Sequence, residues 1–401
     1  MNLLILTYWS YKDALVQSYT LPYVKIIRDQ NPKHKVFLVT IEQPLHKMSD
    51  EDWANECSKL KMENIELIRF KYDHFGFKMI LRIIGFIPKL IKLIKQQKIE
   101  VIHSWCMPAG SLGYILSILT SKPLIIDSYE PHAESMVENG TWQKSSFKFK
   151  LLFWLEKKQS KRAKTVIALT KEMAVYAKTK YNAVFDNYYV KPALVDLDKF
   201  NWNIESYNQN REEKNLEDKV ICIYAGKLGG IYLEEEVFDF FKIASNYWGE
   251  NLKIYLLTDK NISEVREFIK KKKIPDSCIE TKFVSHEEIP HYFQIADFAI
   301  NPVKPVPSKR YCTSIKDGEY WSMGLPVVIT QGISDDSEII EKEGIGYVLQ
   351  ELTNKEYLNA CKEIDTLVKK DKEKLRQKIT SVANRYRNFT IAEYIYKEIY
   401  Q

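Results

Sequence analysis

Residues 313–329 read TSIKDGEYWSMGLPVVI. This pattern predicts a helix that begins after a Ser or Thr cap and ends at Gly324, followed by a buried strand after Pro326. The start of such a helix carries free backbone N–H groups and a partial positive charge, which suit a diphosphate. Lys316 adds a full positive charge there, and Glu319, about one turn further on, can accept hydrogen bonds from ribose hydroxyls. The segment therefore predicts an αβ unit with an anion site at its helix start.

Short aliphatic runs alternate with longer amphipathic segments on both sides of this unit. Near-continuous apolar strands between helical patterns are typical of parallel sheets that helices cover on both faces. The sequence therefore predicts an α/β protein with two Rossmann-like domains. The runs are 3–7, 35–40, 65–70, 101–104, 124–127 and 165–169 in the first half, then 220–225, 252–258, 280–284, 298–302 and 326–330.

A polar stretch divides the two predicted domains. Residues 1–195 form the first domain, residues 196–219 a linker rich in Asn and Glu, and residues 220–380 the second domain. Residues 381–401 have helical spacing and are predicted to form a final helix, which either caps the second domain or packs on the first. We expect the two domains to face a cleft at the carboxyl ends of their sheets, the usual ligand site of such folds.

Composition places the chain among globular proteins. Its 401 residues are 45% hydrophobic and 28% charged, which excludes disordered and collagen-like proteins. Six cysteines without a C-x-x-C pair indicate neither a zinc site nor a disulfide framework. The first residues are predicted to form a buried strand and not a secretion signal, and no window is apolar enough to span a membrane. We expect a cytoplasmic protein.

Charge is divided unequally along the chain. Residues 1–195 hold 29 Lys and Arg against 18 Asp and Glu, whereas residues 196–401 hold 30 against 35. In two stretches of the first half, 75–98 and 142–164, basic residues alternate with aliphatic and aromatic ones. Such surfaces suit the anionic inner face of a cell membrane. The alternative is a pair of core helices whose basic faces are solvated or bind an anionic acceptor. No motif for reading nucleic acid accompanies the charge.

Several segments in order resemble GT-B fold glycosyltransferases, especially family 4. The run Ser-x-Lys-x-x-Glu-Tyr-x-x-x-Gly-x-Pro-Val-Val at 314–328 is similar to their nucleotide-sugar site, and YAGKL at 224–228 to the turn that opens their donor domain. Residues 101–110 and 163–170 resemble strands of their acceptor domain, and residues 191–196 resemble the segment before their interdomain linker. The resemblance covers most of the chain.

The resemblance implies transfer of a sugar from a nucleoside diphosphate donor on the second domain to a glycan or lipid-linked acceptor on the first. It implies retention at the anomeric carbon, no metal and no other cofactor, since the nucleotide sugar is itself a substrate. Lys227 and Lys316 would contact the diphosphate and stabilise the charge of the leaving group. The alternative is that Glu319 is an ordinary first-turn carboxylate, which the helix dipole stabilises, and that both lysines are solvated at the surface. The implied donor-binding residues are Gly226, Lys227, Ser314, Ile315, Lys316 and Glu319.

Two positions depart from the family pattern. The family often has a glutamate eight residues before the ribose-binding one, where this chain has Tyr311, and a lysine five residues after the first basic residue, where it has Tyr232. Lys304, Lys309 and Arg310 are candidates to replace these contacts. Two alternatives stay open: a catalytically inactive nucleotide-binding scaffold subunit, and a nonhydrolysing nucleotide-sugar epimerase on the same frame.

Candidate acceptor residues follow strands of the first domain. The resemblance implies that His132 contacts the sugar or assists proton movement, and that Glu130 or Glu134 orients the acceptor; the alternative is that His132 packs in a polar loop. His103 lies in another similar segment. No dinucleotide fingerprint follows the first strand, and the aromatic residues found there either stack on an acceptor or pack under loops. These aromatic residues are Tyr8, Trp9 and Tyr11.

Two D-x-D patterns raise the question of a metal ion. They occur at 50–52 and at 196–198, in a predicted helix start and a predicted loop. Both are predicted to be solvated carboxylates, and no His, Cys and Asp cluster has zinc spacing. We expect no metal site.

Overall fold

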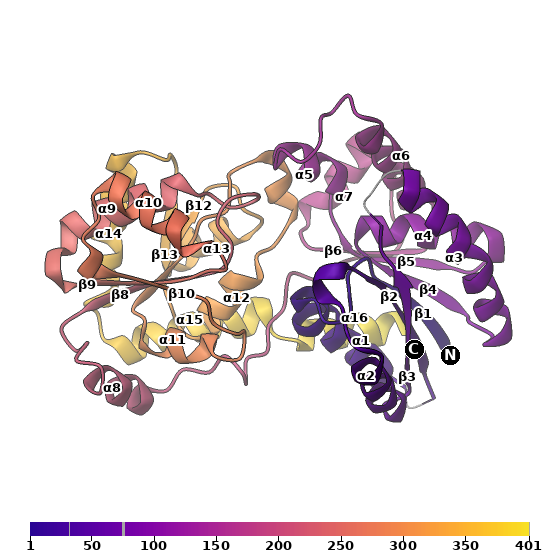
Figure 1. Ribbon diagram of the computed structural model, residues 1–401, viewed down its shortest axis with the longest axis horizontal. Coiled ribbons are helices and arrows are strands. Elements are labelled where there is room, and N and C mark those ends of the chain that lie inside the picture. Colours follow the sequence, from indigo (N-terminus) through magenta and orange to yellow (C-terminus); the bar gives the residue numbers. More distant parts are fainter. Residues whose placement is uncertain (32, 74–76, 401) are drawn as a thin grey trace. The chain divides into compact units, whose positions relative to one another are not determined.

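The computed structural model describes residues 1–31, 33–73 and 77–400, and the chain divides into two compact units. Unit 1 comprises Met1–Pro192 and Phe389–Gln401, and unit 2 comprises Ala193–Asn388. Each unit has a parallel sheet between two layers of helices (Figure 1). The predicted α/β class with two Rossmann-like domains is confirmed.

Unit 1 has a seven-stranded parallel sheet with the order β3-β2-β1-β4-β5-β6-β7. Strand β1, in the interior of the sheet, has a continuous apolar sequence because helices cover both of its faces, and residues 3–5 are fully buried. The strands are β1 (Asn2–Leu6), β2 (Lys35–Glu42), β3 (Ile65–Lys71), β4 (Val101–Trp105), β5 (Leu124–Tyr129), β6 (Thr165–Ala168) and β7 (Tyr188–Val190).

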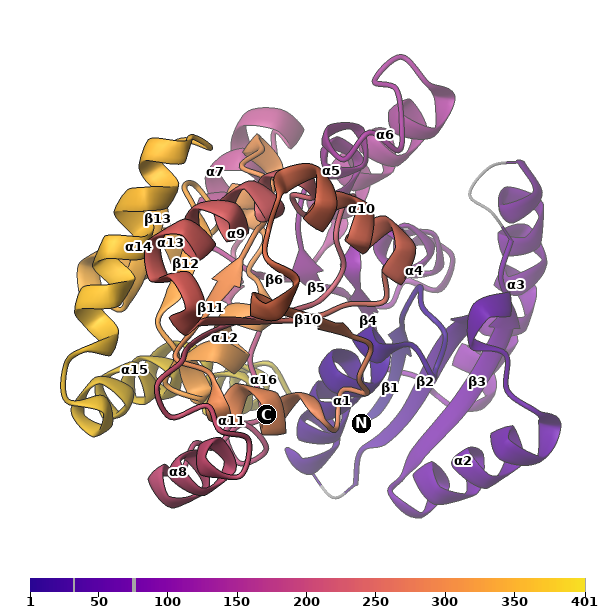
Figure 2. The same ribbon diagram turned by 60° about the vertical axis from the view of Figure 1, so that its left-hand side comes forward.

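Helices α3, α4 and α6 pack together on one face of this sheet, while α1 and α16 lie side by side on the other (Figure 2). Helix α16 comes from the end of the chain. The helices of unit 1 are α1 (Leu21–Asp29), α2 (Asp50–Met62), α3 (Phe77–Gln96), α4 (Cys106–Thr120), α5 (His132–Glu138), α6 (Phe147–Arg162), α7 (Glu172–Tyr176) and α16 (Thr390–Tyr400).

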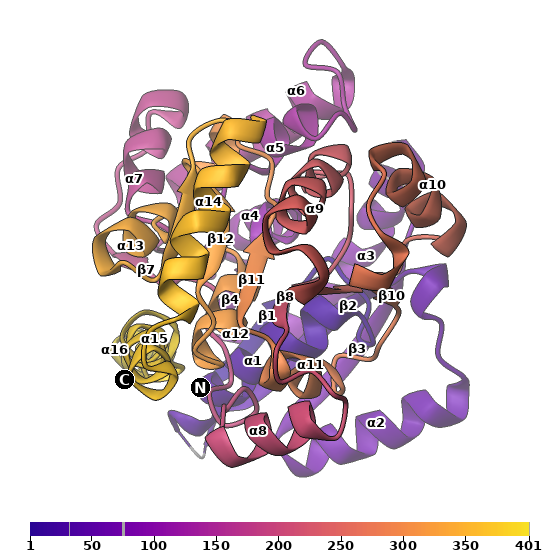
Figure 3. The ribbon, with the colours of Figure 1, turned by 90° about the vertical axis from the view of Figure 1, so that its left-hand side faces the viewer.

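Unit 2 has a six-stranded parallel sheet with the order β10-β9-β8-β11-β12-β13, the strand order of dinucleotide-binding folds. Helices α9, α10 and α14 cover one face, and α11, α12 and α15 cover the other (Figure 3). The strands are β8 (Val220–Ala225), β9 (Leu252–Leu257), β10 (Ile279–Lys282), β11 (Phe298–Asn301), β12 (Val327–Thr330) and β13 (Gly346–Leu349). The helices are α8 (Ile204–Glu212), α9 (Glu235–Trp248), α10 (Ile262–Lys272), α11 (Ile289–Ile295), α12 (Ile315–Ser322), α13 (Asp336–Glu343), α14 (Asn354–Val368) and α15 (Lys372–Arg387).

Residues 196–219, predicted to be a linker, belong to unit 2 and contain helix α8. This helix buries two polar side chains instead of an apolar stripe. Arg211 donates a hydrogen bond to Asp297 at 2.9 Å, and the Tyr207 hydroxyl donates to the same carboxylate at 2.9 Å. The prediction missed α8 because its attachment to the core is an ion pair and a hydrogen bond, which a hydrophobic pattern does not reveal.

The predicted final helix, 381–401, is two helices that belong to different units. Helix α15 ends at Arg387 in unit 2, and α16 packs on α1 in unit 1. The Tyr396 hydroxyl donates to the fully buried Asp127 carboxylate at 2.7 Å, and the buried Lys191 ammonium lies 3.1 Å from the same carboxylate. Burial alone would raise the pKa of Asp127, but Lys191, His103 and Tyr396 lower it to about 2. The end of the chain is therefore anchored in the core of unit 1 by a buried ionic network.

Candidate functional site

The first turn of α12 lies beyond the carboxyl ends of the strands of unit 2. Ser314 precedes the helix with an extended backbone (φ −94°, ψ 124°), and its hydroxyl caps no helix N–H. Its main-chain N–H points instead toward Asp336, 3.4 Å from Oδ2. Residues 313–316 are half-buried, so a ligand can reach this turn. The predicted helix start is thus present, with Ser314 and Ile315 at its entrance.

Lys316 lies directly against the glycine that follows strand β8. A Cβ atom on Gly226 would stand 2.4 Å from Lys316 Cε and 3.0 Å from Nζ, so a side chain at this position would displace the lysine. Gly226 also has φ +151°, a conformation that L-residues rarely adopt. The glycine is therefore required for the close approach of Lys316 to the end of β8, and the two predicted donor segments meet in the fold.

Tyr232, one of the two departures from the family pattern, contacts the same lysine. Lys316 Nζ donates to the Tyr232 hydroxyl at 2.7 Å and lies 4.0 Å from the centre of its ring. The loop that carries Tyr232 is held by main-chain hydrogen bonds from Leu233 to Pro302 (2.7 Å) and from residue 304 to residue 231 (3.0 Å). An ammonium group has three donors, so Tyr232 fixes Lys316 and leaves donors for a ligand.

Lys227 follows Gly226 in the sequence, and its side chain is exposed. Its main-chain carbonyl accepts a hydrogen bond from the Tyr224 hydroxyl, which fixes the turn. The structure therefore brings Gly226, Lys227 and Lys316 together at the carboxyl end of β8.

Glu319 lies on the same helix, one turn further on, and is held by a histidine that the sequence did not single out. The His286 Nε2 atom lies 3.0 Å from Glu319 Oε1, and Lys199 Nζ lies 3.0 Å from His286 Nδ1. The Glu319 side chain is 9% exposed and that of His286 36%. The signal available in the sequence was position alone: His286 follows β10 at the carboxyl edge of the sheet, where ligands of such folds bind.

In unit 1, His132 and Glu130 lie together after β5. His132 Nδ1 lies 3.1 Å from Glu130 Oε1, and each side chain is about a quarter exposed. Burial and the nearby Glu134 carboxylate raise the pKa of Tyr176. The start of α5 is held by Glu156, whose fully buried carboxyl group accepts from the Ala133 N–H at 2.8 Å. His132 and Glu130 thus form a solvent-accessible pair on a rigid support.

Two of the predicted acceptor residues are buried. His103 has no exposed surface, stacks on Trp105 and hydrogen-bonds to the Tyr400 hydroxyl at 2.5 Å. Tyr11 is 2% exposed and donates to Glu56 at 3.0 Å. Both side chains face inward, so we remove them from the acceptor candidates and assign them to the packing of unit 1, which for Tyr11 is the alternative that the sequence left open.

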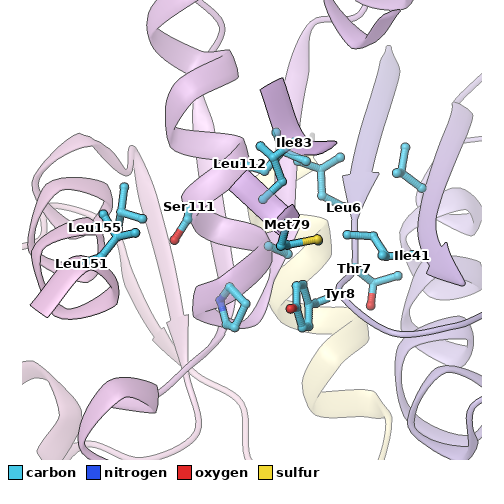
Figure 4. Close-up of a pocket in the computed structure, with 13 residues that line it drawn as sticks. Leu6, Thr7, Tyr8, Ile41, Met79, Ile83, Ser111, Leu112, Leu151 and Leu155 are labelled. Atoms are coloured by element: carbon cyan, nitrogen blue, oxygen red, sulfur yellow. The ribbon is translucent and has the colours of Figure 1, made fainter. Parts of the chain in front are cut away.

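Tyr8 lines an apolar pocket of about 60 Å³ in unit 1, between the end of β1 and helices α3, α4 and α6 (Figure 4). The ring of Tyr8 also packs edge-to-face on Tyr72. Trp9 is half-buried, and its carbonyl accepts from the Ile41 N–H. Three of the side chains that line the pocket carry a hydroxyl group, those of Thr7, Tyr8 and Ser111, and the others are apolar. The lining residues are Leu6, Thr7, Tyr8, Val39, Ile41, Met79, Ile83, Pro108, Ala109, Ser111, Leu112, Leu151 and Leu155.

The two basic amphipathic stretches form helices α3 and α6 of unit 1. Both bury part of their apolar surface, with Phe86 and Leu90 of α3 in the core. Both also expose large apolar side chains, including Ile84 on α3 and Phe147 and Trp154 on α6. Phe75 and Gly76 of the first stretch lie outside the described residues.

The remaining expectations concern metals and membranes. Asp196 Oδ1 accepts the N–H groups of Asp198 and Lys199, so this D-x-D pattern closes a turn. Within the described ranges, no group of three or more His, Cys, Asp or Glu side chains is arranged to hold a metal ion. Across the same part of the chain, every helix is too short or too polar to traverse a bilayer.

Comparison with known proteins supports the predicted resemblance. Residues 31–199 match the family model described as Glycosyltransferase Family 4. No curated protein matches the chain in sequence.

Solved structures share the fold over the full chain. HepE from Anabaena in complex with UDP is similar with a TM-score of 0.74 and 13% identity, covering 100% of this chain and 99% of that one. WaaG, a glycosyltransferase involved in lipopolysaccharide biosynthesis, has a TM-score of 0.71, 12% identity and 100% coverage of both chains. Sucrose-phosphate synthase from Thermosynechococcus elongatus has a TM-score of 0.70 and 12% identity, covering 100% of this chain and 98% of that one. The chain has the GT-B fold of these proteins, and the predicted resemblance to family 4 is confirmed over residues 31–199.

Proposed function

We propose that this protein is a glycosyltransferase that takes a sugar from a nucleoside diphosphate sugar bound to unit 2. The observation that carries the proposal is the position of Lys316, which lies at the first turn of α12 and against Gly226 after β8. A cation and a helix N-terminus at one point are suited to a diphosphate. The Family 4 match and the GT-B fold support the same conclusion.

The proposed chemistry is stabilisation of the leaving diphosphate. Negative charge develops on this group as the bond to the sugar breaks, and fixed cations and N–H dipoles lower the barrier when they are oriented beforehand. Lys316 is oriented by Tyr232, and Lys227 extends from the adjoining turn. We assign Lys316 and Lys227 to the diphosphate, Ser314, Ile315 and Gly226 to the walls of the site, and Glu319 to the ribose.

We take UDP as the first candidate for the nucleotide, since HepE and a second solved structure of similar fold, MnaA from S. aureus, bind UDP. Retention at the anomeric carbon and independence from metals and other cofactors remain part of the proposal. His132 and Glu130 are the proposed acceptor-side groups, because their accessible pair can move a proton.

The donor assignment is tested at Glu319. Replacing Glu319 with Ala removes the proposed ribose acceptor and is expected to lower UDP affinity by at least about tenfold, or about 1.4 kcal/mol. Glu363→Ala, an exposed glutamate on α14 of the same unit, is the matched control. Unchanged UDP affinity in a folded Glu319→Ala variant would refute the site. A thermal-shift screen with UDP, GDP, ADP and CMP identifies the base.

The proposed acceptor is a glycan or a lipid-linked sugar used in polysaccharide biosynthesis at the inner face of the cell membrane. Support comes from α3 and α6, where exposed apolar groups such as Ile84 and Trp154 accompany exposed lysines. An apolar and basic surface binds anionic lipid, at about 1 kcal/mol for each basic residue near the membrane. The apolar pocket beside Tyr8 adjoins the same two helices.

Membrane attachment is tested by removing charge from α3. Lys89, Lys92 and Lys95 are exposed, and replacing all three with Gln is expected to release the protein from vesicles that contain phosphatidylserine. The control replaces three exposed lysines of unit 2, Lys362, Lys370 and Lys378, and so removes the same charge elsewhere. Equal co-sedimentation of the α3 variant and the wild type would rule out α3 as the anchor.

A nucleotide-binding scaffold subunit is the second candidate. Position 232 holds a tyrosine, which accepts from Lys316, where the family often has a lysine, so the site has one cation fewer. Tight UDP binding without hydrolysis or transfer across donors and acceptors would favour this candidate. An epimerase would instead convert the nucleotide sugar without any acceptor.

A further inference from the structure

Three polar side chains from separate segments of unit 2 form a line that ends at Glu319. Lys199 comes from the loop before α8, His286 from the loop after β10, and Glu319 from α12. The Nζ to Nδ1 and Nε2 to Oε1 distances are both 3.0 Å. The fold alone brings these residues together, since 33 positions separate the histidine from the glutamate.

The line selects one tautomer of the imidazole. An ammonium group can only donate, so His286 Nδ1 accepts from Lys199 and the ring proton must be on Nε2. That N–H then donates to Glu319 Oε1. The main chain of Lys199 is held, because its N–H donates to Asp196 at 3.1 Å, and the imidazole packs edge-on against the buried Phe200 ring at 5.8 Å.

The carboxylate keeps acceptor positions for a ligand. Each carboxylate oxygen can accept about two hydrogen bonds, and His286 occupies one position on Oε1. A mostly buried carboxylate on a rigid helix has little freedom to turn toward a ligand, so it must be oriented before the ligand binds. A charge-assisted hydrogen bond fixes this orientation strongly. The partly exposed His286 makes this hydrogen bond, 3.0 Å from Glu319 Oε1.

We propose that His286 is a positioning residue that aims Glu319 at the vicinal hydroxyls of a ribose and so makes unit 2 selective for ribonucleotides over deoxyribonucleotides. This inference rests on the proposed function and deepens it. His286 acts through Glu319, so its loss must weaken the binding of a ligand with a 2′-hydroxyl more than the binding of a ligand without one.

The experiment measures UDP and 2′-deoxy-UDP affinities by calorimetry for the full-length protein and its variants. We expect wild type to prefer UDP, and His286→Ala to lower UDP affinity about tenfold while changing 2′-deoxy-UDP affinity less than about twofold. His286→Gln, which can place an amide N–H near the position of Nε2, should keep most of the preference. His291→Ala, an exposed histidine on α11, should match wild type.

A His286→Ala variant that keeps the wild-type preference for UDP overturns the inference. So does tighter UDP binding by this variant, because His286 would then occupy the ribose position and compete with the ligand. If His286→Ala unfolds, His286→Asn replaces it, since the shorter side chain cannot reach Glu319. A wild-type protein that binds neither nucleotide overturns the UDP assignment as well, which separates failure of the proposed function from failure of the His286 role.

Discussion

Gly226 and Lys316 form the central contact of the candidate site at the residue scale. The lysine aliphatic chain lies on the main chain at the end of β8, in space that any other residue at position 226 would fill. The Tyr232 hydroxyl then holds the ammonium group at 2.7 Å. A cation held at both its stem and its head loses little entropy on binding a ligand, which favours affinity.

Gly226→Ala tests this contact. The added methyl group must displace Lys316 from its position 2.4 Å away, so we expect UDP affinity to fall at least about tenfold, as it would on loss of a charged hydrogen bond. Gly230→Ala is the matched control, because Gly230 also has a positive φ (+65°) but has open space where its Cβ would lie. Equal UDP affinities for the two variants, each measured by calorimetry, would show that Lys316 need not lie against position 226.

Individual side chains were predicted unevenly from the sequence. The structure brings Lys316 and Gly226 together, and the sequence pointed to both because motif and chemistry coincide in short runs. His103 was misplaced among acceptor residues because a polar residue in a strand gives no sign of being fully buried. His286 was missed because its partners, Lys199 and Glu319, are distant in sequence. Only the fold shows such contacts.

Helices α5 and α6 are joined at the element scale by one buried acid. Glu156 of α6 accepts from the Ala133 N–H of α5 and from the Tyr181 hydroxyl, both at 2.8 Å. Burial raises the pKa of Glu156 to about 8, despite these two hydrogen bonds. The carboxyl group is therefore mostly protonated at neutral pH in the folded protein.

Stability must then depend on pH through this group. Between the ordinary Glu pKa, near 4.5, and about 8, the folded state holds a proton that the unfolded state has lost. The stabilising contribution is complete below pH 4.5 and is lost as the pH rises through 8. Wild type should lose unfolding free energy as the pH rises from 5 to 9, whereas Glu156→Gln, which cannot ionise, should not lose this contribution. We expect the stability of the variant relative to wild type to increase by at least about 1 kcal/mol over this range. Urea unfolding at both pH values measures it, and a difference independent of pH would contradict the buried, protonated acid.

Elements with long apolar runs were predicted well, and short or polar ones were not. The predicted strand 220–225 coincides with β8, because a fully buried parallel strand has a continuous apolar sequence. The edge strands β7 and β13 were missed, since they span 188–190 and 346–349 and are only partly buried. Helix α8 was missed because Arg211 and Tyr207 attach it through polar contacts.

At the scale of the whole molecule, the family match and the candidate donor site lie in different units. Residues 31–199 carry the match to Glycosyltransferase Family 4 and lie almost wholly in unit 1, whereas Lys316 and Glu319 belong to unit 2. The fold likeness covers both units. The chain enters unit 2 at Ala193 and returns to unit 1 at Phe389, where α16 completes the core. The proposed donor site therefore lies in the unit that the family match hardly covers.

A crystal structure of the full-length protein with UDP tests the central claim most directly. We predict that the diphosphate lies within hydrogen-bonding distance of Lys316 Nζ and the first main-chain N–H groups of α12, with the ribose hydroxyls on the Glu319 carboxylate. Density for UDP at any other place, with Lys316 and Glu319 bound only to Tyr232 and His286, would contradict the account.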